Sequence, residues 1–237
     1  MNSEQVMWSA EEVIGFFNTK HQSIASSTSP VIKLAFENMV SGLLATKRRI
    51  ESTEEHHCAY LKLIVEEETL NTLHWKDLAL IDDVLFGFFY CGLSAIECSV
   101  YGVYSGCQSL RPNEFPLQEK QITIESTIKS FKNNAITKEF AESLEQLIAL
   151  TDYKEWNDCR NVLTHRGIGR MKFEEATSNA DYLWLAKLVL DENRTISLDK
   201  HTTESKISWL LIELIKLIKS GKNVLLNLEP EKASAKI

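Results

Sequence analysis

Apolar residues recur at three- and four-residue spacing along most of this chain, which is the pattern of helices that bury one face. The spacing predicts helices over the stretches 31–46, 54–71, 121–133, 137–150, 153–165 and 203–226. A capping box formed by Ser9 and Glu12 predicts one more helix, which begins near residue 10. Ser29 and Pro30 are the residue types that favour the start of the next helix.

Residues that end or interrupt helices separate several of these stretches. The cations of Lys47-Arg48-Arg49 suit a helix C-terminus, so they predict that the second helix ends there. Two prolines break the chain in the segment 111–116, and two glycines in the segment 167–169 stop the helix before them. The run at 54–71 is therefore expected to be a separate, third helix.

One region departs from the helical pattern. Residues 182–190 and 195–198 are apolar runs on either side of a polar turn, which predicts a small β-hairpin near 182–198. Only 9 glycines and 4 prolines occur in 237 residues, too few for the many turns of a sandwich or barrel. We therefore predict an all-α fold with this hairpin, as a single domain over 1–228 followed by a disordered tail over 229–237.

The most apolar stretch, 74–107, supports two interpretations. Between Val84 and Cys107 its only formal charge is Glu97, so it is long and apolar enough to cross a bilayer. The mid-segment carboxylate and the lack of a second span favour instead the central helix of a bundle. In that helix Glu97 is expected to be buried and paired with a cation. Small residues at every fourth position should let a neighbouring helix approach closely: Ser94, Cys98, Gly102 and Gly106.

Composition narrows the class of protein. The chain has 44% apolar and 25% charged residues, as average globular proteins do, which excludes disordered and collagen-like chains. Its 33 acidic and 26 basic residues give a net charge of −7. Five cysteines, an odd number without CxxC spacing, are typical of reduced thiols, and the first eight residues do not resemble a secretory signal. We expect a cytoplasmic protein with no membrane partner.

Motifs of the common nucleotide and metal enzymes are missing from the sequence. It contains no GxxxxGK[ST], GxGxxG, HExxH or GxSxG, which argues against P-loop nucleotide hydrolysis and zinc proteolysis. The segment 54–58 collects Glu, His and Cys, but adjacent helical residues point to different sides and rarely bind one ion. We therefore expect neither a metal site nor a cofactor.

The strongest candidate for chemistry lies at the end of the helix predicted over 153–165, where Arg160, Asn161 and His165 occur. A histidine can move a proton near neutral pH, and an arginine can stabilise the charge that builds on phosphorane oxygens. Asn161 lies four residues before His165, on the same side of a helix, where it can orient the imidazole. Arg160 lies about 140° round an ideal helix from His165, so one helix does not aim both at one point.

Positive charge gathers around these residues although the whole chain is acidic. Between positions 154 and 172 five cations stand against two anions, a local charge of +3. Such a patch can hold a phosphodiester backbone where the rest of the surface repels it. The candidate substrate-binding residues in this window are Arg166, Arg170 and Lys172.

The sequence Arg160-Asn-Val-Leu-Thr-His165 resembles the signature of the HEPN superfamily, the "higher eukaryotes and prokaryotes nucleotide-binding" domains. In that signature an arginine, a polar residue and three to five further residues precede a histidine. The resemblance extends from Trp75 to Arg170 and includes the long apolar helix before the motif. It implies a HEPN-like helical bundle, here with extra N- and C-terminal helices, and catalytic roles for Arg160, Asn161 and His165.

The resemblance also implies a function and partners. Many HEPN domains are metal-independent endoribonucleases that dimerise so that two motifs face one cleft. RNA or a nucleotide, a second copy of the chain and an antitoxin protein are therefore the expected partners of a toxin or defence effector. Two alternatives stay open: a non-catalytic nucleotide-binding or protein-interaction HEPN domain, and a helix end at which Arg160 and His165 only cap the helix and pair with acids such as Asp158.

Overall fold

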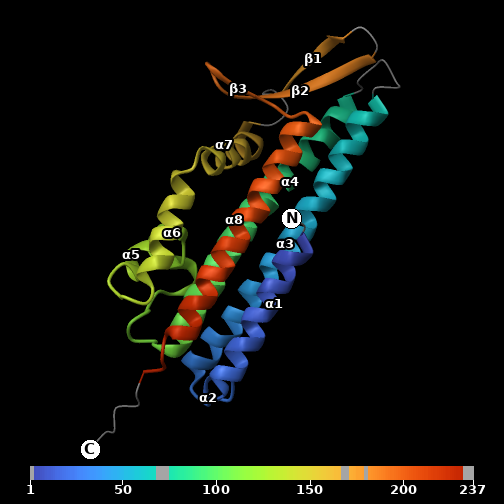
Figure 1. Ribbon diagram of the computed structural model, residues 1–237. Coiled ribbons are helices and arrows are strands. Elements are labelled where there is room, and N and C mark those ends of the chain that lie inside the picture. The colour runs from blue at the N-terminus through green and yellow to red at the C-terminus, as the bar shows by residue number, and fades with distance from the viewer. Residues whose placement is uncertain (1–2, 68–74, 167–170, 179–180, 232–237) are drawn as a thin grey trace, which may run out of the picture. The chain divides into compact units, whose positions relative to one another are not determined.

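The computed structural model describes residues 3–67, 75–166, 171–178 and 181–231, of which the helices form the larger part (Figure 1). The protein is mostly helical (78%), with eight α-helices and a three-stranded antiparallel sheet in the described ranges. The helices are α1 (Ser3–Lys20), α2 (Gln22–Ala25), α3 (Pro30–Glu67), α4 (Trp75–Leu110), α5 (Ile124–Phe131), α6 (Lys138–Ala149), α7 (Thr151–Arg166) and α8 (Lys200–Asn227). The predicted helical character is confirmed.

The sheet contains one strand more than the sequence predicted. β2 (Asp181–Asp191) and β3 (Arg194–Ser197) form the hairpin expected near 182–198. β1 (Met171–Ser178) pairs antiparallel with the other edge of β2 (Figure 1). Because β1 carries two adjacent glutamates and no regular alternation of apolar and polar residues, its sequence gives little sign of a strand.

The start of α1 and the end of α3 differ from the predictions. Ser9 does not cap a helix, because α1 begins at Ser3 and the Ser9 hydroxyl donates to the Gln5 carbonyl at 2.7 Å inside it. α3 begins at Pro30 as expected, but it continues through the cations at 47–49 to Glu67. The buried positions keep helical spacing across that point and override the C-terminal preference of the cations: Met39, Leu43, Thr46, Ile50, Thr53, His57 and Tyr60.

The chain divides into two compact units. The first unit comprises Met1–Arg48, Ser94–Ala149 and Leu211–Ile237, and the second comprises Arg49–Leu93 and Leu150–Leu210. α3, α4 and α8 each contribute a stretch to both units, whereas α7 and the sheet belong to the second. Of the tail predicted to begin at residue 229, positions 232–237 lie outside the described residues, while the backbone amide of Glu231 donates to the Leu110 carbonyl at 2.9 Å.

Small residues of α4 allow close packing in the first unit, as predicted. A methyl group built on Gly42 of α3 would lie 2.8 Å from the Cα of Gly102 on α4, so the two backbones touch. A methyl group on Gly106 would lie 2.5 Å from a methyl carbon of Leu225 on α8. Carbon atoms do not approach so closely, which is why these positions need glycine.

Glu97 is exposed, so the prediction that it is buried is wrong. Asp83, Tyr90 and Glu97 are spaced by seven residues, two helical turns, and all three are exposed. α4 therefore leaves one narrow line of its surface uncovered, and the carboxylate lies on it. In the described part of the chain α4 alone is apolar and long enough to cross a membrane, over Leu78–Leu110, and 61% of that apolar window is buried inside the protein, as in a core helix.

Candidate functional site

α7 carries the predicted site and is fixed by its buried side. Trp156 is fully buried, and its indole N–H donates to the Phe89 carbonyl of α4 at 2.8 Å. Gly92 leaves room for the indole, because a methyl group there would overlap the ring. Burial also raises the pKa of the Cys159 thiol to about 12, so this cysteine stays protonated and is a poor nucleophile.

The other side of α7 faces a pocket of about 540 Å³. Asn161 and His165, both exposed, line it together, as their four-residue spacing predicted. The sheet supplies the opposite wall from the β2–β3 hairpin. The lining residues are Asp158, Asn161, Val162, His165, Leu190, Asp191 and Arg194.

Arg160 is placed differently from its two neighbours. Its side chain is half-buried and donates from Nη2 to Oδ1 of Asn157 at 2.8 Å, and it does not line the pocket. The expected angular mismatch between Arg160 and His165 is therefore present in the structure. Within one chain, the pocket brings together Asn161 and His165 without Arg160.

The predicted substrate-binding residues are described only in part. Lys172 is exposed near the start of β1. Arg170 and the side chain of Arg166 lie outside the described residues.

Arg194 is the residue that the sequence analysis missed at this pocket. It begins β3 and pairs with two carboxylates: Nη2 donates to Asp158 of α7, and Nε lies 3.4 Å from Oδ2 of Asp191. The hydrogen bond that the guanidinium donates to Asp158 is the main reason why its pKa is raised further. The four residues from Asp191 to Arg194 gave a sequence signal for a turn, but not for a turn that packs against α7.

The charge of the pocket differs from the charge of the sequence window around it. Two carboxylates and one guanidinium give the described lining side chains a net charge of −1 when His165 is neutral. The described cations of the window 154–172, which are Lys154, Arg160 and Lys172, do not line the pocket. Among the described lining residues, an anionic ligand would therefore depend on Arg194.

The segment 54–58 does not form a cluster of metal ligands. In the described ranges no three His, Cys, Asp or Glu side chains are close enough to hold an ion. His57 is buried instead, and its Nε2 lies 2.9 Å from the Thr203 hydroxyl.

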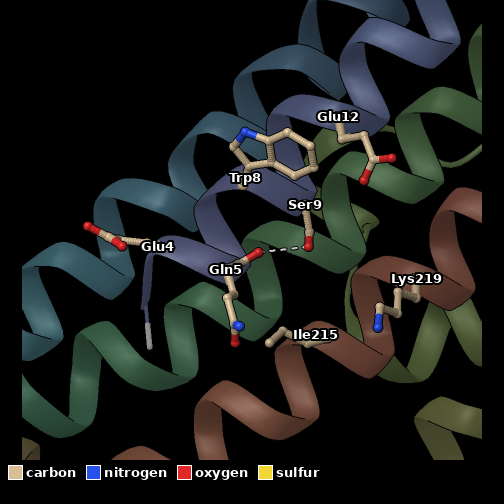
Figure 2. A pocket seen from close by; sticks show the side chains of 7 residues that line it. All are labelled: Glu4, Gln5, Trp8, Ser9, Glu12, Ile215 and Lys219. Atoms are coloured by element: carbon tan, nitrogen blue, oxygen red, sulfur yellow. Dashed lines mark hydrogen bonds between the residues drawn. The ribbon is translucent and has the colours of Figure 1, made fainter. Parts of the chain in front are cut away.

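A larger pocket, of about 710 Å³, lies in the first unit between α1 and α8 (Figure 2). Trp8, which is 70% exposed, borders it together with Glu12 and Lys219. Figure 2 shows Glu4 directed away from the other lining side chains. Since none of its described lining residues is a histidine, cysteine or arginine, that part of the pocket offers no counterpart to the proposed proton-transfer chemistry of His165.

Nothing among the family models, curated proteins and solved structures compared with this chain matches it. Function must therefore be inferred from the chemistry of the pocket itself.

Proposed function

We propose that this protein is a metal-independent endoribonuclease that uses the pocket beside His165. The observation that carries the proposal is that His165 and Asn161 line one pocket of about 540 Å³, a volume typical of small-ligand sites. The resemblance of the segment 160–165 to the HEPN signature supports the same reaction, and with it a HEPN-like arrangement of the helices around α7.

The chemistry needs one group that both accepts and returns a proton. His165 takes the proton of a ribose 2′-hydroxyl, the 2′ oxygen attacks the adjacent phosphorus, and the bond from phosphorus to the 5′ oxygen breaks. The imidazolium then returns the proton to the departing 5′ oxygen. The products are a 2′,3′-cyclic phosphate and a 5′-hydroxyl, and Asn161 orients the imidazole throughout.

A homodimer belongs to this proposal because Arg160 does not line the pocket of its own chain. A two-fold axis can bring the Arg160 of a second copy toward a cleft shared by both motifs. Light scattering should then give twice the chain mass. In mixtures of wild type with an Arg160→Ala/His165→Ala chain, activity should fall with the square of the wild-type fraction. A linear decline, or an active monomer, would assign the whole reaction to one chain.

A second candidate is a non-catalytic nucleotide-binding domain. One observation favours it: the arginine at the pocket, Arg194, is already paired with two carboxylates, and Arg160 is bonded to Asn157. Such a domain would bind a nucleotide in the pocket without stabilising the charge of a transition state.

Cleavage of a labelled RNA in excess EDTA decides between the two candidates. Wild-type protein should produce cyclic phosphate ends, detected by mass spectrometry. His165→Ala should lose at least about 100-fold in rate, since general acid–base catalysis contributes that much or more. The matched control is His201→Ala, an exposed histidine on α8 that does not line the pocket. Full activity in His165→Ala, or an absolute need for added metal, would reject the mechanism, while nucleotide binding without cleavage would support the second candidate.

A further inference from the structure

The pocket beside His165 has a cation from outside the motif, Arg194 of β3. Among the described lining residues, Arg194 carries the one side chain that is positive at every physiological pH. Arg160, the arginine of the motif, is directed to Asn157 one turn earlier on α7. Within the described part of a single chain, Arg194 is therefore the arginine at this pocket that a phosphate can meet.

Two carboxylates hold the Arg194 guanidinium at the pocket wall. Asp158 of α7 binds Nη2, and Asp191 lies near Nε across the hairpin turn. These contacts use two of the three guanidinium nitrogens. The third, Nη1, makes no hydrogen bond within the described ranges, and the Arg194 side chain is 46% exposed. A planar guanidinium that is fixed on two sides and open on the third is oriented for a charge-assisted bond to an oxyanion.

We propose that Arg194 binds a phosphate of the nucleic acid in this pocket, and that Asp158 and Asp191 hold it in position while limiting how tightly the anion binds. This inference rests on the proposed use of the pocket for RNA or a nucleotide. Asp158 forms the direct bond and fixes the fork. Asp191 makes the longer contact, at 3.4 Å, and its side chain is 55% exposed, so it contributes more repulsion of the phosphate than support of the arginine.

The competing explanation is structural: the bond between Arg194 and Asp158 only fastens the β2–β3 hairpin to α7. The two explanations predict different results for a folded Arg194→Ala variant. If Arg194 binds phosphate, its loss weakens binding, while removing the Asp191 charge strengthens it. If Arg194 only fastens the hairpin, folded Arg194→Ala binds the phosphate as wild type does.

The test measures binding of a fluorescein-labelled 2′-O-methyl RNA hexamer, which cannot form a cyclic phosphate, by fluorescence anisotropy. Arg194→Ala should raise the Kd about tenfold or more, as expected for the loss of one charge-assisted bond. Arg194→Lys, which keeps the charge but loses the planar fork, should fall between Arg194→Ala and wild type. Asp191→Asn should lower the Kd about threefold, a gain that misfolding cannot produce.

The control variant is Arg48→Ala, which removes an exposed arginine of α3 and should keep the Kd within about twofold of wild type. Circular dichroism checks that each variant is folded. Unchanged binding by folded Arg194→Ala, equal or weaker binding by Asp191→Asn, or no binding by wild type would overturn the inference.

Cleavage assays keep this inference separate from the ribonuclease proposal. Binding that depends on Arg194, without any cleavage of RNA in EDTA, rejects the ribonuclease and supports the role of Arg194. Cleavage that depends on His165, with an unchanged KM in Arg194→Ala, supports the ribonuclease and rejects the role of Arg194.

Discussion

Along α7, Trp156 and Cys159 are fully buried, whereas Asn161 and His165 lie exposed at a pocket less than three helical turns further on. The buried side is held by ring packing and by the indole bond to Phe89. The exposed side lines the pocket together with residues of the β2–β3 hairpin. Substitutions on the two sides of α7 should therefore have different effects. Those on the buried side should change the stability of the protein, and those on the exposed side should change the proposed cleavage of RNA.

Trp156→Ala should cause the largest loss of stability. It creates a cavity where the indole packs on Phe88 and Trp209, and it removes the hydrogen bond from the indole N–H to the Phe89 carbonyl. We expect a loss of about 3 to 5 kcal/mol, the usual cost of truncating a large buried aromatic side chain. Chemical denaturation measures it, with Trp156→Phe as the milder control. A loss below about 1 kcal/mol would show that this side of α7 does not anchor the helix.

Glu155→Ala should have the next largest effect. Glu155 binds the ammonium of Lys206 at 3.0 Å, and the Lys206 side chain is only 5% exposed. Without its partner this charge is left buried, which costs about 3 kcal/mol. The double variant Glu155→Gln/Lys206→Met should recover most of the stability, because it buries no charge. A double variant as unstable as Glu155→Ala would mean that packing, and not charge, is responsible.

Acid should destabilise the protein through buried His57. Burial lowers the pKa of His57 below its ordinary value, so the unfolded chain binds a proton at a higher pH than the folded chain does. Stability is therefore fully present above pH of about 6.5 and decreases as the pH falls from there through the lowered folded pKa. Melting temperatures recorded between pH 8 and pH 5 give the slope of stability against pH.

His57→Gln should flatten that slope but not abolish it, because burial lowers the pKa of His21 in the first unit as well. A slope that is equal in wild type and His57→Gln would contradict the assignment to His57.

His165→Ala should change stability least of all. An exposed side chain contributes within about 0.5 kcal/mol, so the denaturation curve should coincide with that of wild type. In the same preparation RNA cleavage should be lost. If the variant were unfolded, the two sides of α7 would not be separable, and loss of cleavage would say nothing about chemistry.

Local patterns in the sequence predicted most helices, and they predicted that Asn161 and His165 lie on the same side of α7. The start of α3 at Pro30 follows from Ser29 and Pro30, and α7 ends at Arg166, one residue from the predicted end at His165. The joint lining of the pocket by Asn161 and His165 follows from four-residue spacing on one helix.

Features that depend on partners distant in sequence could not be predicted. β1 is a strand because β2 offers it hydrogen bonds, not because of its own residues. Arg194 reaches the pocket because the hairpin packs against α7, and no spacing in the chain encodes that contact. Glu97 was predicted to be buried, and this was wrong because a single charge in an apolar helix does not reveal that one line of the helix surface stays exposed.

The contact between Gly42 and Gly102 has a consequence for recognising distant homologues. A methyl group on Gly42 would meet backbone atoms of Gly102, which no substitution at position 102 removes, so both positions must stay small unless the two helices move apart. This couples two sites sixty residues apart, independently of any catalytic motif. In homologues with the same packing, both positions should therefore stay small, even where the pocket has lost its histidine.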